Sequence, residues 1–427
     1  MARDPREHDH DDPPTSTGFT WLQALRVAGP FLLIAGSAWS SPLTTVFTLT
    51  LTGDRLLGVA ALAALIVVGL RRQAHWTPVH TALAIFVGAQ ILTTLLNAGT
   101  WPQGPKFVAV YVLGFACFAL AAECARGADG QRRMASAWIA VAVVVAIVGT
   151  VVANLSNVYQ RPLWGAGQAQ VLFAGTSRRL LLFGPQVTLS EWNLFSSFLV
   201  VPFTLSLWLW RRDGGSQRGR VAALAAAVFG LVTGITRATW LSMAALVMLW
   251  TWAKRPRPGQ LATLGAMAAA ALLVQALCLG ASPLFERGLE RSTVTHRFII
   301  NDATIESWET QPLLGHGAGS VNRLSVPTRA GPPMKIWTGN VVLFVLHDSG
   351  MLGFATLLAL TVVVCRRGWR AMRRDAHAPT PSLVVPLLAA GAALAFAYQF
   401  THALWLMYPY VYLGFLTAST EPEGGDA

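Results

Sequence analysis

Apolar residues gather in long runs along most of the chain, and short charged or Pro/Gly-rich breaks separate these runs. A run of roughly 20 apolar residues is long enough to cross a bilayer as a helix. Because backbone groups in lipid must be paired internally, the predicted fold is an all-α polytopic membrane protein with about twelve transmembrane helices. The predicted spans are 27–47, 56–70, 78–98, 106–124, 134–155, 189–210, 221–236, 238–253, 260–281, 340–365, 382–401 and 403–418.

Composition agrees with a membrane location. Hydrophobic residues make up 54% of the 427 residues and charged residues only 12%, whereas soluble domains carry about a quarter charged residues. These values exclude soluble two-domain enzymes, coiled coils and disordered scaffolds. The four cysteines fall in or at the ends of apolar runs and form neither a disulfide framework nor a paired metal motif.

The net charge of +12 comes mainly from arginine and predicts the orientation of the spans. In a hydrophobic chain such a surplus indicates cytoplasmic loops rather than nucleic acid binding. With both termini in the cytoplasm, every predicted inner connection is basic. These connections carry Arg71, Arg72, Arg126, Arg132, Arg133, Arg211, Arg212, Arg218, Arg220, Lys254, Arg255, Arg257, Arg366, Arg367, Arg370, Arg373 and Arg374.

The predicted spans divide the chain into a few regions. Residues 1–22 read as a disordered cytoplasmic tail, 23–281 as spans one to nine, 340–418 as spans ten to twelve, and 419–427 as a second cytoplasmic tail. Between them, 282–339 is one large extracytoplasmic loop. Within it, 293–311 favours an amphipathic helix that starts near Ser292 or Thr293 and stops before Pro312. Such a helix could lie on the outer bilayer surface as a lid.

Several arginines fall on the predicted outer side, against the usual charge bias. Most of them lie in the long outer segments 156–188 and 282–339, and long translocated loops escape that bias. Arg237 is different, because it sits in a tight turn between two short spans. An arginine there needs an anionic partner or a wet cavity. Guanidinium groups match phosphate oxygens, so the functional interpretation is an outward-facing site for a phosphorylated or pyrophosphorylated ligand.

Four sequence elements, roughly within residues 175–355, resemble the O-antigen ligase and polysaccharide polymerase superfamily of bacterial membrane glycosyltransferases. TRATWLS (236–242) looks like its Ser-Arg-Gly-x-Trp-Leu element, and ETQPLLGHGAGS (309–320) is similar to its His-Pro-Leu-Leu-Gly-x-Gly-x-Gly element. Arg178 and Arg179 followed by SEWNLFSSFL (190–199) look like an arginine before the Asp/Glu-Pro-Asn-x-Phe helix start. GNVVLFVLHDSGMLGF (339–354) resembles the His-Asn-x-x-Leu…Glu-x-Gly-x-x-Gly element.

The resemblance fails at one position that matters for the chemistry. The ligases of this family have a histidine before the asparagine, proposed to act as base on the acceptor hydroxyl, and this chain has Gly339 before Asn340. His347 lies two helical turns further on the same face, about 10 Å along the helix. It is a candidate base or a packed helix histidine. Glu191 is a candidate base, a group that orients Arg179 or Arg237, or a carboxylate favoured by the helix dipole.

The resemblance implies metal-independent transfer of a glycan from a polyprenyl-diphosphate carrier, such as undecaprenyl diphosphate, at the outer face of the bacterial inner membrane. The acceptor would be a glycan or a lipid, and no cofactor is implied. The implied catalytic residues are Arg237, Arg179, Asn340, His347 and Glu191, and the implied substrate-binding residues are Arg178, Gly315, Gly317, Gly319 and Trp240. Ligase and polymerase chemistry are not separated.

The alternative is a multispan transporter or flippase of an anionic lipid-linked envelope precursor. A transporter is expected to show internal repeats and broken, charged helices near the bilayer midplane. The chain shows no convincing repeat, and its charged candidates gather at one end of the predicted spans. The sequence therefore favours the enzyme.

Overall fold

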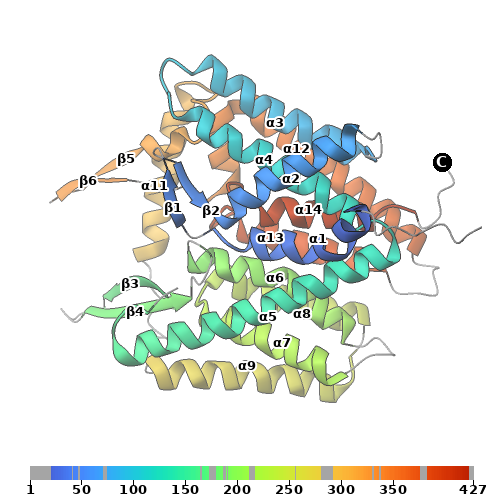
Figure 1. Cartoon of the computed structure of the whole chain (residues 1–427). Coiled ribbons are helices and arrows are strands. Elements are labelled where there is room, and N and C mark those ends of the chain that lie inside the picture. Colours follow the sequence, from blue (N-terminus) through green and yellow to red (C-terminus); the bar gives the residue numbers. More distant parts are fainter. Residues whose placement is uncertain are drawn as a thin grey trace, which may run out of the picture.

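The computed structural model describes residues 21–40, 42–46, 49–70, 75–163, 166–172, 179–185, 189, 191–210, 217–254, 256–279, 292–328, 331–335, 338–375 and 382–422. Most of the tail predicted for 1–22 and the end of the tail predicted for 419–427 lie outside these ranges. Within them the protein is a helical bundle with three short two-stranded hairpins (Figure 1).

Each predicted apolar run contains a helix, and the helix predicted for 293–311 forms as Ser292–Glu309. The described helices are α1 (Trp21–Ser37), α2 (Gly53–Leu70), α3 (Pro78–Leu96), α4 (Gly104–Cys124), α5 (Gly127–Tyr159), α6 (Trp192–Leu209), α7 (Gln217–Thr233), α8 (Arg237–Lys254), α9 (Pro258–Leu279), α11 (Ser292–Glu309), α12 (Val341–Asp375), α13 (Val384–Ala397) and α14 (Tyr408–Ser419).

Five of the described helices are long and apolar enough to cross a bilayer. They are α3, α4, α5, α9 and α12. Shorter apolar helices lie within α1, α6 and α13, at Val27–Ser37, Asn193–Leu209 and Val384–Ala397. The fold is therefore that of a helical membrane protein.

The first predicted span, 27–47, is wrong at its C-terminal end. α1 stops at Ser37, and Pro42–Val46 (β1) pairs with Leu49–Thr52 (β2) as an antiparallel hairpin. Pro42 has no N–H to continue a helix, and the Thr- and Val-rich segment after it favours a strand. The apolar run thus contains a helix and a hairpin strand in succession.

Two further hairpins lie in the predicted outer segments. Ala166–Leu172 (β3) pairs with Arg179–Pro185 (β4), and Ser325–Thr328 (β5) pairs with Gly331–Lys335 (β6). Asn157 at the end of α5 fixes the first of these hairpins, because its side chain exchanges two 2.8 Å hydrogen bonds with the backbone of buried Phe183. Figure 1 shows all three hairpins and α11 at the same end of the bundle.

Aromatic side chains fill the middle of the bundle. Trp138 of α5 stacks on Phe198 of α6, with ring centroids 6.0 Å apart, and contacts Tyr412 of α14 edge-on. Phe198 also meets Tyr408 edge-on at 5.6 Å. These contacts join α5, α6 and α14 in a core that fixes where the helix ends lie relative to one another.

The end of the bundle opposite the hairpins is held by ion pairs. Glu421, just after α14, lies 3.9 Å from Arg126 after α4 and 3.5 Å from Arg367 near the end of α12. Arg126 also pairs with Glu123 at 3.1 Å, and Arg374 donates to the carbonyl of Thr420. Three distant segments of the chain thus meet through charge at this end.

Candidate functional site

Helix α12 is broken at Gly350, where the backbone has φ 63° and ψ −161°. Glycine adopts positive φ without the steric cost that a side chain would bring. The break frees backbone N–H and C=O groups, which must find other partners inside the protein.

The segment Pro312–Ser320, the glycine loop, supplies those partners. On one side of the break, the N–H groups of Met351 and Leu352 donate to the carbonyls of Pro312 and Leu313, at 2.9 and 3.2 Å. The loop therefore takes the place of the missing turn of helix.

On the other side of the break the direction of donation is reversed. The N–H of His316 donates to the carbonyl of His347 at 2.9 Å, and the N–H of Gly317 donates to the carbonyl of Asp348 at 2.7 Å. The glycine loop and α12 are consequently joined backbone to backbone on both sides of Gly350.

The alternating glycines of this loop are required by close packing. Gly315, Gly317 and Gly319 have φ of 60°, 91° and 74°. A Cβ at Gly315 would lie 2.6 Å from the backbone nitrogen of Gly350, and one at Gly319 would overlap the ring of Phe107. The predicted substrate-binding role of these glycines stays a prediction, and their conformations give them a structural role.

Helix α3 and the turn after it hold the loop from the opposite side. The Asn97 amide donates to the carbonyl of Gly315 at 3.1 Å, and the Trp101 indole donates to the carbonyl of Ala318 at 2.7 Å. The Thr94 hydroxyl accepts the N–H of Ala318 at 2.9 Å. The glycine loop is thus fixed between α3 and the broken α12.

Asp348 is fully buried directly before the break. Its Oδ2 accepts the N–H of Gly319 at 2.5 Å, and its Oδ1 accepts the N–H of Val321 at 3.1 Å and the Ser320 hydroxyl at 3.0 Å. A buried carboxylate needs such donors in place of water. Asp348 is therefore the anchor of the glycine loop.

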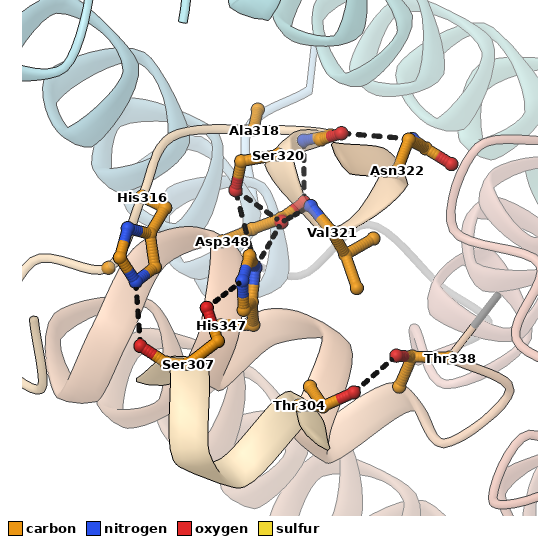
Figure 2. A network of polar contacts seen from close by, with 12 residues as sticks. Thr304, Ser307, His316, Ala318, Ser320, Val321, Asn322, Thr338, His347 and Asp348 are labelled. Carbon is orange, nitrogen blue, oxygen red and sulfur yellow. Dashed lines mark hydrogen bonds and ion pairs between the residues drawn. The ribbon is translucent and has the colours of Figure 1, made fainter. Parts of the chain in front are cut away.

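His347 lies beside this carboxylate and is only 2% exposed. Its Nδ1 is 3.2 Å from Asp348 Oδ1, and its Nε2 is 3.1 Å from the hydroxyl of Ser307 on α11. The His316 ring stacks on it with centroids 4.8 Å apart, and Figure 2 shows Ser307 in contact with both histidines. Burial lowers the pKa of His316. The structure thus brings the predicted glycines and His347 into one polar network.

Helix α11 docks on the bundle through polar side chains. The Thr304 hydroxyl lies 2.7 Å from that of Thr338, and Ser307 meets His347 (Figure 2). Phe298, expected on an apolar face of this helix, is 62% exposed. Thr304 is thus buried and Ser307 half-buried in these contacts, whereas Phe298 belongs to no buried apolar face.

Arg237 begins α8 directly after a strained turn. Ile235 has φ 46°, which is unfavourable for a β-branched residue. The hydroxyl of buried Thr236 lies 3.1 Å from Asn193 Oδ1 and 3.4 Å from the Ser196 hydroxyl, both on α6. This contact joins TRATWLS to SEWNLFSSFL and leaves Arg237 half-buried.

Glu191 and Trp240 lie in the same two elements. Glu191 precedes α6, and its side chain does not cap that helix. Burial raises the pKa of its carboxyl group. The Trp240 indole donates to the carbonyl of Leu231 at 2.9 Å, which fastens α8 to α7. Glu191 therefore retains the properties of a candidate base. Trp240 has a packing role, and its predicted part in substrate binding stays a prediction.

The segment around Asn340 leaves no room for a histidine at position 339, where the resembling ligases have one. Asn340 Oδ1 accepts the N–H groups of Val342 and Leu343, at 2.9 and 3.1 Å, and so caps α12. A Cβ at Gly339 would overlap the carbonyl oxygen of Phe400. Histidine at position 339 cannot fit this backbone path.

The remaining predicted arginines are described only in part. Arg178 lies outside the described residues, and the backbone of Arg179 begins β4 opposite Leu172. Among the side chains that the structure describes, no group of three or more His, Cys, Asp or Glu residues is placed to hold a metal ion.

Tyrosines link the two halves of the candidate site. The hydroxyls of Ser197 on α6 and Tyr408 lie 2.7 Å apart, and Tyr398 donates to Tyr408 at 3.2 Å. The carbonyl of Tyr398 accepts the N–H of Val341 at the start of α12. TRATWLS at the start of α8 thus contacts SEWNLFSSFL at the start of α6, and the glycine loop contacts α12. These tyrosines join the first pair of segments to the second.

Sequence reasoning missed Ser307 and Ser320. The adjacent His347 and Asp348 in an apolar run were a signal for a buried polar cluster. No local signal marked the serines, because each meets His347 only through folding.

Comparison with known proteins gives no matching family and no matching curated relative. The fold defines the class, a helical membrane protein, and the site alone bears on its activity.

Proposed function

We propose that this protein is a membrane glycosyltransferase that moves a glycan from a polyprenyl-diphosphate carrier to a glycan or lipid acceptor. In this proposal the twelve apolar helices all cross or enter the bacterial inner membrane, and both termini are cytoplasmic. The hairpin end of the bundle then faces outward, and the end around Glu421 faces the basic cytoplasmic side.

The observation that carries the proposal is the presentation of Arg237. Arg237 is half-buried and starts α8 after a strained turn that is fastened to the start of α6. Backbone strain is retained where the surroundings over-determine it, and such places cluster at functional sites. A fixed guanidinium group matches a diphosphate in two-pronged geometry and stabilises charge on it as the glycosidic bond breaks.

Glu191 is the base that fits this proposal better than His347. Its pKa is raised by burial, and its side chain is not used to cap α6. A carboxyl group with a raised pKa is better matched to proton abstraction near neutral pH. His347 Nε2, in contrast, already faces the Ser307 hydroxyl.

A specific observation favours the transporter as second candidate. α12 is a broken helix, and broken helices are typical of transporter binding sites. In this chain the glycine loop pairs the backbone groups beside the break. Vesicles with donor on one side separate the candidates, since a transporter delivers intact lipid-linked glycan to the other side and an enzyme releases free polyprenyl diphosphate.

Arg237→Ala tests the proposal directly. In nanodiscs with a polyprenyl-diphosphate-linked oligosaccharide and acceptor, release of polyprenyl diphosphate should fall about 100- to 1,000-fold. Arg237→Lys should also be slow, because one ammonium group cannot make the forked contact. The matched control is Arg257→Ala, at an exposed arginine before α9. Wild-type release by a folded Arg237→Ala protein would reject the proposal.

A further inference from the structure

Ser307, His347 and Asp348 form a linear chain of polar contacts. The Ser307 hydroxyl lies 3.1 Å from His347 Nε2, and the opposite ring nitrogen, Nδ1, lies 3.2 Å from Asp348 Oδ1. Figure 2 shows the histidine ring between the other two side chains. Ser307 comes from α11, whereas His347 and Asp348 come from α12.

The donors around Asp348 fix where the hydrogens are. Two backbone N–H groups, from Gly319 and Val321, donate to its carboxylate, and a carboxylate is acceptor-only. The Ser320 hydroxyl donates its one hydrogen to Asp348 Oδ1 at 3.0 Å. In each of these contacts Asp348 is the acceptor.

It follows that His347 carries its hydrogen on Nδ1. That N–H points at Asp348 Oδ1 and at the Ser320 oxygen, 3.3 Å away, which has no hydrogen left to give back. Nε2 of the neutral ring is then an acceptor, and the Ser307 hydroxyl donates to it. This is the arrangement of hydrogens in a Ser-His-Asp triad, which is recognised by geometry and not by residue order.

His316 positions the serine and the ring. Its Nε2–H donates to the Ser307 carbonyl at 2.8 Å, and its ring stacks on that of His347. His347 and Asp348 are buried at 2% and 0% exposure, whereas Ser307 is half-buried. The basic nitrogen is therefore shielded from bulk water, and Ser307 is the most exposed residue of the three.

We infer that Ser307 is a nucleophile for acyl transfer, activated by His347 as base and by Asp348 as the group that orients His347. Ser307 Oγ bonds to the carbonyl carbon of a carboxylic ester, and its proton passes to His347 Nε2. The ester C–O bond breaks, and the leaving alkoxide takes that proton. A second alcohol, or water, then removes the acyl group by the same steps in reverse.

Exposed apolar side chains in the loop that carries His316 favour an ester with a long acyl chain. Leu313 and Leu314 in this loop are 71% and 40% exposed. Apolar side chains exposed beside a membrane bundle suit an alkyl chain more than a charged substrate. This inference is independent of glycan transfer, because it uses neither Arg237 nor a diphosphate.

A fluorophosphonate with a long alkyl chain tests the inference on the purified full-length protein. Such probes lose fluoride and phosphonylate activated serines at the hydroxyl oxygen, and peptide mass spectrometry locates the adduct. We expect one adduct on Ser307, no adduct at this peptide in Ser307→Ala, and a rate about 100-fold lower in His347→Gln. The assay contains no glycan donor, so its failure is separate from failure of the proposed glycan transfer.

Thr304→Val is the matched control. Thr304 lies one turn before Ser307 and also docks α11 through its hydroxyl, at Thr338. If Ser307 were only a docking group, removal of either hydroxyl would act alike on α11 and no adduct would form in any variant. Labelling of Ser307 in Thr304→Val supports the inference. An unlabelled Ser307 in folded wild-type protein would overturn it, whether or not His347→Gln folds.

Discussion

The two ends of the bundle satisfy buried charge in different ways. At the hairpin end, the carboxylate of Asp348 is fully buried and accepts backbone N–H groups and a hydroxyl. At the opposite end, the Glu421 side chain is 18% exposed and meets the arginines Arg126 and Arg367 at 3.9 and 3.5 Å. Backbone donors fix geometry, whereas long arginine side chains tolerate movement. The contacts of Asp348 therefore hold the glycine loop in one geometry, whereas the ion pairs of Glu421 hold the ends of α4, α12 and α14 together.

The largest effect should come from removing the anchor of the glycine loop. Asp348→Ala leaves two backbone N–H groups and the Ser320 hydroxyl buried without an acceptor, which costs about 3–5 kcal/mol. Thermal unfolding in detergent should show a strongly lowered midpoint. Asp129→Asn, at an 80% exposed side chain early in α5, is the control and should leave the midpoint unchanged. Equal midpoints for both variants would contradict the comparison between the ends.

A smaller but clear loss is expected at Gly339. In Gly339→Ala the new Cβ meets the Phe400 carbonyl, and backbone cannot move aside as a flexible side chain can. We expect a loss of about 1–3 kcal/mol, measured as a lower unfolding midpoint. Gly265→Ala in α9, where a Cβ would meet nothing within 4 Å, is the control and should change stability by less than about 1 kcal/mol. A stable Gly339→His would show that the backbone leaves room for a family-type base.

The ion pairs of the opposite end should matter less. Glu421→Gln removes the carboxylate that meets Arg126 and Arg367; because burial opposes these pairs and raises the pKa of Glu421, the free energy of unfolding should change by less than about 1 kcal/mol. The difference from wild type should shrink further in 1 M salt, where the Debye length is about 3 Å. A salt-independent loss would mean that Glu421 acts through packing rather than charge.

The smallest effect, and of opposite sign, is expected at Glu191. Burial raises the pKa of Glu191 in the folded protein, so folding favours the protonated carboxyl group. That contribution is complete below the ordinary pKa of the group and is lost as pH rises through the raised value. Glu191→Gln should therefore have the higher unfolding midpoint at pH 8, and the difference should disappear towards pH 4. A variant less stable than wild type at pH 8 would show that the ionised carboxylate has a stabilising partner.

The helices could be predicted from the sequence because long apolar runs leave the backbone few alternatives. The error at 42–46 arose because this apolar run contains Pro42 and β-branched residues, which favour a strand although the length of the run suits a helix. Within the site, His347 and the glycines were predicted as residues but not as neighbours. Ser307 is 40 positions from His347, and only the docking of α11 on α12 brings them together. Likewise, the reason for Gly339 lies in the path of Phe400, which no local pattern reveals.

The break at Gly350 ties the length of the glycine loop to the register of α12. Backbone hydrogen bonds on both sides of the break pair particular loop residues with particular helix residues. Inserting or deleting a single residue between Pro312 and Gly317 would shift every pair beyond it. Residues in this stretch can therefore be substituted, but its length cannot change. An epitope tag inserted there would break the hydrogen bonds that join the two parts of α12 through the glycine loop.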